Sequence, residues 1–103
     1  MGNLGFPFIP IHPGELLKEE LEYRHISQRS FAMKLGLPYT ALNEILNGKR
    51  PVTTEFALLM EAALGVEPGL LLRMQTSYNL QVAKKDKKLL TRINEIKKVC
   101  VVL

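Results

Sequence analysis

Residues 27–50 read SQRSFAMKLGLPYTALNEILNGKR, and two short patterns of apolar residues lie within them. The first part of this stretch has apolar residues spaced one, three and four positions apart, as one face of a helix requires: Phe31, Ala32 and Leu35. Its second part repeats the pattern at Ala41, Leu42, Ile45 and Leu46. Gly36 can supply the left-handed conformation that ends a helix, and Pro38 cannot continue one. The stretch therefore predicts two short helices joined by a tight turn.

Two helices joined by so short a glycine-containing turn form a helix-turn-helix. The second helix leaves polar residues on its outer face, namely Tyr39, Thr40, Asn43, Glu44 and Asn47. The major groove of DNA is wide enough for a helix and displays hydrogen-bond donors and acceptors on every base pair. A polar outer face suits such a groove, so this layout is typical of a DNA-binding protein.

The segments on either side of this stretch predict further helices. Pro13 suits the first position of a helix, because a proline there gives up no hydrogen bond. Thr53 can cap a later helix that Gly65 would end. Pro68 would open the next helix, and Asp86 would cap the last one. The expected inner faces are Leu16, Leu17 and Leu21 in the first helix and Phe56, Leu59, Met60 and Ala63 in the helix after Thr53. In the last helix the apolar residues Leu89, Leu90, Ile93 and Ile96 share one face.

A chain of 103 residues has room for one domain with a modest core. We predict an all-α domain of five to six helices with a C-terminal helical extension. We expect an N-terminal arm at residues 1–12, the helix-turn-helix DNA-binding domain at 13–83, and a basic helix with an apolar tail at 84–103. The tail, VCVVL, would pack across the body or pair with a partner strand, and Cys100 would be a packed side chain rather than a reactive thiol.

The net charge of +4 is unevenly distributed. Residues 27–60 carry four Lys or Arg and two Asp or Glu, whereas residues 84–103 carry seven and two. The basic C-terminal segment is either a solvated helix face or a contact surface for phosphate or an acidic partner. An amphipathic helix at a chain end often completes a dimer, and recognition of a palindrome requires one.

Several classes of protein are excluded by the composition. The chain has no apolar run long enough to span a membrane and begins without a basic segment before an apolar one, so we expect a cytoplasmic protein. A single Cys excludes an internal disulfide framework and a Cys-based zinc site. His12 and His25 lack partners at a metal-ligand spacing. Because we find no nucleophile with a paired base and no Gly-rich phosphate loop, we expect neither an enzyme nor a bound cofactor.

Four segments resemble, in order and spacing, the HigA-type antitoxins of the lambda-repressor-like (XRE) helix-turn-helix class. They are IHPGELLKEELE, SQRSFAMKLGL, ALNEILNGKRPVTTEFALLMEAALGV and LLLRMQTSYNLQVAKKDKK. The match runs from about Ile11 to Leu103, and the pair IHPGE and LNEILNGKRPVT is specific to this group. The resemblance implies a type II toxin–antitoxin role. The protein would neutralise a small ribonuclease-type toxin that cleaves messenger RNA, and as a homodimer it would bind operator DNA and repress their shared operon.

Some residues depart from the family pattern. Ser30 stands where Glu is usual, and His25, which would turn left-handed after the first helix, stands where Gly is usual. Pro38 takes the place of the Ser or Thr that caps the recognition helix, and Tyr39 follows where Pro is common. We expect these changes to leave the fold intact and to give this chain its own base preference. A Tyr at this tip can contact phosphate, stack on a base or touch a thymine methyl group.

The resemblance and the layout together assign the DNA contacts. The predicted DNA-contacting residues are Gln28, Arg29, Tyr39, Thr40, Asn43, Asn47, Lys49 and Arg50. In this class a Gln at position 28 typically contacts backbone phosphate and braces the second helix. The residues at the tip of that helix are base-edge candidates, and Asn43 can pair with adenine N6 and N7. Glu44 would accept from a cytosine amine or face water.

Other functions remain open at this stage. A stand-alone helix-turn-helix transcriptional regulator without a toxin partner would carry the same DNA-contacting residues. A pure interaction module would keep a toxin-binding surface and would bind DNA weakly. For the toxin, both the N-terminal arm and the basic C-terminal helix are candidate surfaces, because fold alone does not fix a docking site.

Overall fold

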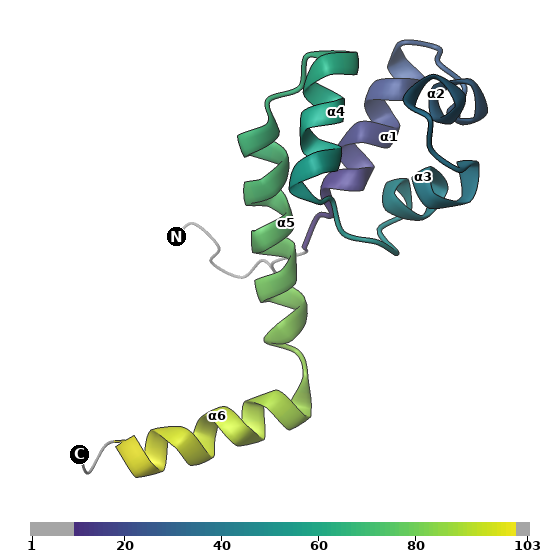
Figure 1. Ribbon diagram of the computed structural model, residues 1–103. Coiled ribbons are helices and arrows are strands. Elements are labelled where there is room, and N and C mark those ends of the chain that lie inside the picture. Colours follow the sequence, from purple (N-terminus) through teal and green to yellow (C-terminus); the bar gives the residue numbers. More distant parts are fainter. Residues whose placement is uncertain (1–9, 101–103) are drawn as a thin grey trace.

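The computed structural model describes residues 10–100, which form six helices and no strand (Figure 1). The helices are α1 (Pro13–Tyr23), α2 (Gln28–Leu35), α3 (Tyr39–Leu46), α4 (Thr54–Leu64), α5 (Pro68–Ala83) and α6 (Lys87–Cys100). The predicted all-α fold class is therefore confirmed. Most of the predicted arm, residues 1–9, and residues 101–103 of the predicted tail lie outside the described residues. No helix within residues 10–100 is long and apolar enough to cross a membrane.

Local sequence signals set the helix ends. A side-chain oxygen of Ser27, Thr53 and Asp86 accepts a hydrogen bond from the backbone N–H three residues further on, at 3.1, 3.2 and 3.3 Å, so these residues cap α2, α4 and α6. Gly36 ends α2 with φ 72°, and Gly65 ends α4 with φ 73°. The ends at Gly36, Thr53, Gly65 and Asp86 were predicted from the same residues.

One core of buried apolar side chains holds the first five helices together. Its members are Leu17, Leu21, Phe31, Ala32, Leu42, Ile45, Leu46, Val52, Phe56, Ala57, Met60, Leu64 and Leu71. Helix α1 packs on α3 and α5, α2 packs on α3, and α4 packs on α5. Burial of this apolar surface supplies the main favourable free energy of folding. Among the inner residues predicted for the first three helices, Leu16, Leu35 and Ala41 are half-buried and the others are buried.

The predicted inner face of α4 is partly wrong. Phe56 and Met60 are buried, but Leu59 is 38% exposed and Ala63 is exposed as well. Ala57 and Leu64 take their places in the core. Because all residues from 56 to 60 are apolar, the sequence permits more than one face of this helix to turn inward. Packing against α5 selects the face that is buried.

Helix α5 leaves the core part-way along its length. Leu71 and Gln75 are buried, and Gln75 Oε1 accepts a hydrogen bond from Val52 N–H at 2.8 Å, which ties α5 to the loop after α3.

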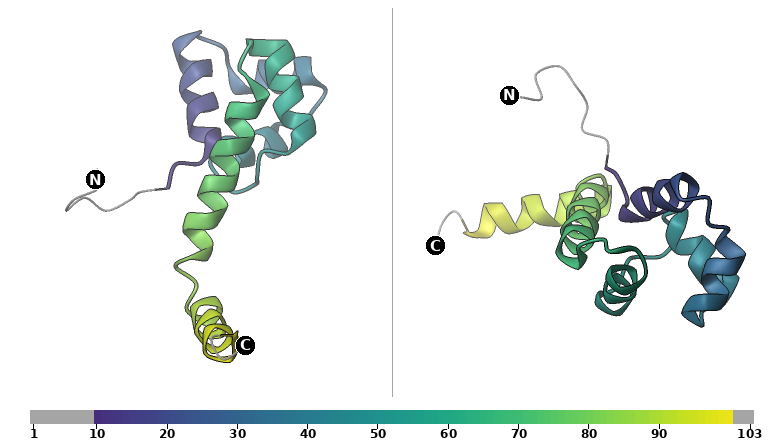
Figure 2. Two further views of the ribbon diagram at one scale, coloured as in Figure 1. Left: turned by 90° about the vertical axis from the view of Figure 1, so that its left-hand side faces the viewer. Right: turned by 90° about the horizontal axis from the view of Figure 1, so that it is seen from above.

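Over its described length, Lys87–Cys100, α6 contains no buried residue. Figures 1 and 2 show α6 projecting away from the body formed by the other helices. Its apolar side chains are therefore uncovered in the single chain.

The prediction for the tail is wrong for the two residues of it that are described. Val99 and Cys100 are the last residues of α6 and are exposed, so they neither pack across the body nor form a strand. The thiol of Cys100, predicted to be packed, is exposed. The helix that Asp86 caps continues through these residues because a β-branched residue lowers helix propensity only slightly.

Candidate nucleic-acid interface

Helix α2, the turn after it and α3 form the predicted helix-turn-helix. Leu37 N–H donates to the Ala32 carbonyl at 3.0 Å, and Gly36 N–H donates to the Met33 carbonyl at 3.1 Å. Pro38 precedes α3 and provides no side-chain cap. Backbone hydrogen bonds therefore close the turn, and the placement of α3 against α2 does not depend on a capping side chain.

The outer face of α3 is polar and accessible. Thr40 and Asn47 are exposed, while Tyr39, Asn43 and Glu44 are half-buried. The opposite side of the helix supplies Leu42, Ile45 and Leu46 to the core. Figure 1 shows α2 and α3 on the side of the body away from α5. The polar face of α3 can therefore approach a partner without obstruction from α5 or α6.

A row of side-chain hydrogen bonds joins α1, α2 and α3 along this face. Lys18 Nζ donates to Asn47 Oδ1 at 3.2 Å, Asn47 Nδ2 donates to Asn43 Oδ1 at 3.2 Å, and Asn43 Nδ2 donates to Gln28 Oε1 at 3.1 Å. The contact predicted between Gln28 and the second helix is thus present. Lys18 was missed by sequence reasoning, because its partner lies 29 residues further along the chain and no local pattern links them.

Arg29 and Tyr39 adjoin one end of this row. The guanidinium carbon of Arg29 lies 4.2 Å from the centre of the Tyr39 ring, which is a cation–π contact. The Tyr39 hydroxyl lies 3.5 Å from Asn43 Nδ2. The structure therefore brings Gln28, Arg29, Tyr39 and Asn43 together where the N-terminal ends of α2 and α3 meet.

The two basic residues after α3 differ in their surroundings. Arg50 Nε forms an ion pair with Glu44 Oε1, whereas Lys49 is exposed. The backbone N–H groups of both residues donate to the Glu44 carbonyl, at 2.8 and 3.2 Å. Glu44, for which a cytosine contact or exposure to water was expected, instead neutralises part of the charge of Arg50. Lys49 consequently offers the less compensated positive charge of this loop.

His12 has a structural role that the sequence reasoning missed. Its Nδ1 accepts a hydrogen bond from Gly14 N–H at 2.9 Å, so His12 caps α1 although His is not a usual capping residue. The ring is buried and lies edge-on to Tyr78 of α5, with 4.9 Å between ring centres. A Cβ added to Gly48 would lie 3.5 Å from His12, so the loop after α3 also closes against this side chain. His12 thus ties α1 to α5 and to the loop that carries Lys49.

Gly14 allows the start of α1 to approach the end of α3. A Cβ added at this position would lie 2.0 Å from the carbonyl oxygen of Ile45 and 3.0 Å from its carbonyl carbon. Two backbones can come this close only where one residue has no side chain. The contact sets the position of α3 relative to α1 and therefore the position of its outer face.

Burial lowers the pKa of His12 below its ordinary value of about 6.5, and a backbone hydrogen bond at Arg50 and the Glu15 carboxylate only partly offset this. Protonation would also remove the Nδ1 acceptor and place a positive charge at the positive end of the α1 dipole. The unfolded chain therefore binds this proton more tightly. His12 contributes stability at neutral pH that is lost as the pH falls from about 6.5 through the lower pKa of the folded state.

We expect the free energy of unfolding to decrease in this window by up to about 1.4 kcal/mol per pH unit. The variant His12→Asn, which keeps a capping acceptor but does not titrate, should lose this dependence. Urea unfolding between about pH 7.5 and 5 measures it. His25→Asn is the matched control, since His25 is exposed and Asn tolerates its φ of 58°. If His12→Asn retained the pH dependence of the wild type, His12 would not be its source.

The comparisons with known proteins agree with this geometry. The helix-turn-helix family HTH_3 matches residues 17–71, which is more than half of the chain. The chain belongs to this XRE-type helix-turn-helix family. The virulence-associated protein I of Dichelobacter nodosus is 37% identical over 78 residues, which cover 75% of this chain and 72% of that protein.

Two solved structures show the same fold within the helix-turn-helix family. An addiction module antidote protein of the HigA family from Coxiella burnetii has 35% identity and a TM-score of 0.73, covering 85% of this chain and 95% of its own. The Pseudomonas aeruginosa protein PA4674, solved in complex with its operator DNA, has 27% identity and a TM-score of 0.68, covering 75% of this chain and 82% of its own. The predicted resemblance to HigA-type antitoxins is confirmed, and the chain has a DNA-binding, antitoxin-like fold.

Proposed function

We propose that this protein is a DNA-binding antitoxin that acts in the cytoplasm by binding rather than by catalysis. As a homodimer it would bind operator DNA, repress the operon it shares with a toxin, and neutralise that small mRNA-cleaving toxin. The observation that carries the proposal is the accessible polar face of α3, held by the hydrogen bond between Asn43 and Gln28. The likeness to a protein solved with its operator DNA supports it.

The side chains on this face fall into two groups, those that can hydrogen-bond to bases and those that can contact the DNA backbone. Asn43 Nδ2 donates to Gln28 and, at 3.5 Å, to the Tyr39 hydroxyl, while its Oδ1 accepts from Asn47, so one acceptor position of this amide stays free. That acceptor matches adenine N6, and a bond to adenine N7 would replace the long contact with Tyr39. The exposed Thr40 stands beside it at the tip of α3. We assign these residues, with Tyr39, to the bases.

The remaining predicted residues surround the base-facing tip and carry donors or positive charge. They are Gln28, Arg29, Asn47, Lys49 and Arg50. Arg and Lys neutralise phosphates and release counterions, which makes affinity depend on salt. We assign this group to the DNA backbone, where contacts fix orientation and register rather than base preference.

The experiment is a salt series of binding between the purified protein and the DNA just upstream of its own gene, with unrelated DNA as the reference. We expect Asn43→Ala to relax sequence preference, because a good bidentate contact discriminates by roughly 1–3 kcal/mol. We expect Lys49→Ala to weaken binding to both DNAs alike and to reduce the salt slope by about one. Equal effects of the two variants on the two DNAs would mean that α3 does not read bases.

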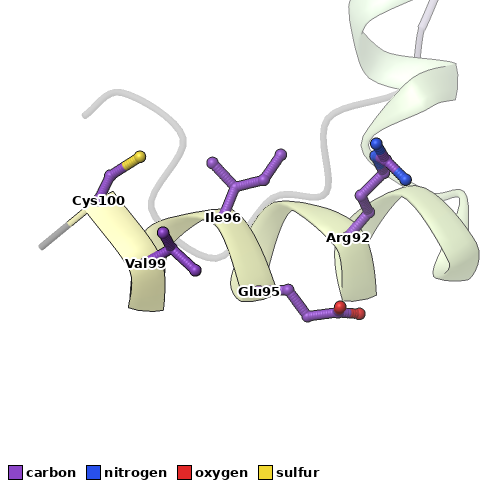
Figure 3. A pocket seen from close by; sticks show the side chains of 5 residues that line it. All are labelled: Arg92, Glu95, Ile96, Val99 and Cys100. Atoms are coloured by element: carbon purple, nitrogen blue, oxygen red, sulfur yellow. The ribbon is translucent and has the colours of Figure 1, made fainter.

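Dimerisation is assigned to α6. Its apolar residues Leu89, Ile93, Ile96 and Cys100 recur at alternating spacings of four and three, as in one seam of a two-helix packing. Figure 3 shows Arg92, Glu95, Ile96, Val99 and Cys100, the described residues that line a hollow along this helix. We propose that a second molecule covers it. A second copy of α6 would cover the apolar seam and place two α3 helices on one DNA.

The toxin partner is the second half of the proposal. It is supported by the likeness to the Coxiella burnetii addiction module antidote protein. Expression of the small gene beside this one should arrest growth, and co-expression of this chain should restore it. Operator binding without any such rescue would leave a stand-alone transcriptional regulator as the function.

A further inference from the structure

We infer that Lys18 is a positioning residue for DNA binding, which orients the amide of Gln28 through Asn47 and Asn43. The inference rests on the proposed function and concerns a residue outside the helix-turn-helix itself. Lys18 lies on α1, is half-buried, and reaches Asn47 Oδ1 at 3.2 Å. It thereby begins the row of hydrogen bonds that ends at Gln28 on α2.

The direction of the row follows from the chemistry of Lys18. An ammonium group can only donate hydrogen bonds, so the atom of Asn47 that faces it must be the carbonyl oxygen. The amide nitrogen of Asn47 is then directed at Asn43, whose oxygen must accept from it. The nitrogen of Asn43 is in turn directed at Gln28, whose oxygen accepts. One donor at the start of the row thus fixes the orientation of three amides that could otherwise flip.

The far end of the row presents a donor. With Oε1 of Gln28 engaged by Asn43, the amide nitrogen of Gln28 remains as its free end. A phosphate oxygen accepts hydrogen bonds and donates none, so this orientation of Gln28 is the one that suits a DNA backbone. The whole row then has one polarity, from the ammonium of Lys18 to the phosphate. Hydrogen bonds in such a chain polarise and strengthen one another.

Two acidic residues of α1 are placed to form an ion pair with Lys18, but among the described residues neither does so. Glu15 and Glu22 lie three residues before it and four residues after it, the spacings at which ion pairs form on a helix. The ion pairs of the described residues join Arg24 to Glu20, Arg50 to Glu44, and Arg73 to Glu67. The Lys18 ammonium is instead directed across to α3, which is the arrangement a positioning role needs.

The DNA test uses the full chain and a double-mutant cycle. Lys18→Met keeps the length of the side chain and removes its donor, so operator affinity should fall about fivefold, the usual net effect of one hydrogen bond. Lys18→Arg keeps a pure donor and should restore binding. In a Gln28→Ala background, Lys18→Met should have no further effect, because the atom that it positions is absent. Asn47→Ala should weaken binding at least as much without removing a charge, since it breaks the row and also removes the backbone contact assigned to Asn47.

Two results of that cycle would overturn the inference. If Lys18→Met weakened binding as much in the Gln28→Ala background as in the wild type, Lys18 would act independently of Gln28. If it reduced the salt slope by about one, as a lost phosphate contact does, Lys18 would touch the DNA directly.

A second measurement needs no DNA. The side-chain amide signals of Gln28, Asn43 and Asn47 can be followed by NMR in the free protein, with the Gln75–Asn79 pair on α5 as an internal reference. Lys18→Met should shift all three signals and leave the reference in place, and Lys18→Arg should shift none. A change confined to the Asn47 signal would show that Lys18 does not orient Asn43 and Gln28, and would overturn the inference. A wild-type chain that bound no DNA would refute the proposed function, and the orientation of the amides would still be decided by these signals.

Discussion

Replacing Gly14 with Ala should lower the free energy of unfolding by about 3 kcal/mol, the upper part of the usual cost of overpacking. The added Cβ would stand 2.0 Å from the carbonyl oxygen of Ile45, and this neighbour is backbone, which cannot rotate away. The sign of the effect is informative, because Ala is favoured over Gly in a helix by about 1 kcal/mol. A large loss would show that the approach of α1 to α3 overrides helix propensity.

The chain supplies a matched control for this substitution. Gly69 follows Pro68 at the start of α5 as Gly14 follows Pro13 at the start of α1. The two nearest atoms to a Cβ at Gly69 would be Glu67 Oε1 at 2.9 Å and Arg73 Nη1 at 3.0 Å. Both atoms end flexible exposed side chains, so Gly69→Ala should be neutral or stabilising by up to about 1 kcal/mol. Urea unfolding followed by circular dichroism compares the two variants. Equal effects would mean that the contact with Ile45 does not constrain the fold.

Replacing Ile93 with Asp should convert the proposed dimer to a monomer and weaken operator binding by about 100-fold. Ile93 lies in the apolar seam of α6, and a carboxylate there would have to be buried without a partner. The loss of affinity follows because two linked half-site contacts bind about 100-fold or more tighter than one. The body should keep its stability, since no residue of α6 belongs to its core.

Asn94→Asp is the control, because it adds the same charge at the next residue, outside the seam. Light scattering gives the mass of each variant, and binding to the upstream DNA gives the affinity. A dimeric Ile93→Asp variant would place the dimer interface elsewhere. A wild-type chain that was monomeric at micromolar concentration would remove the role proposed for α6.

The parts of the fold that could be predicted are those set by neighbouring residues. Ser27, Gly36 and Thr53 define helix ends through bonds that reach at most a few positions along the chain, and the structure has each of them. The left-handed His25, at φ 58°, was predicted on the same grounds. The inner faces of the first three helices followed from periodicity, because their apolar and polar residues alternate clearly.

The parts that could not be predicted depend on partners far away in the sequence, or on segments whose apolar residues do not mark a single helix face. In α4 the apolar residues surround the helix, so only its packing on α5 could select the inner face. Lys18 faces α3 and His12 faces α5 across gaps in sequence that no motif spans. At the candidate interface the sequence indicated the side chains at the tip of α3, whereas the ion pair between Arg50 and Glu44 could be recognised only in the structure.

The turn between α2 and α3 has a consequence for how this protein could acquire a new target. Its closure relies on backbone hydrogen bonds from Gly36 and Leu37, while the side chains of Pro38 and Thr40 point to solvent at the tip of α3. Scaffold and reading surface are thus encoded by separate residues. Changes at the tip can alter the bases that α3 prefers while the angle of α3 to the rest of the domain stays the same. A single substitution there can therefore change the preferred DNA sequence without destabilising the fold.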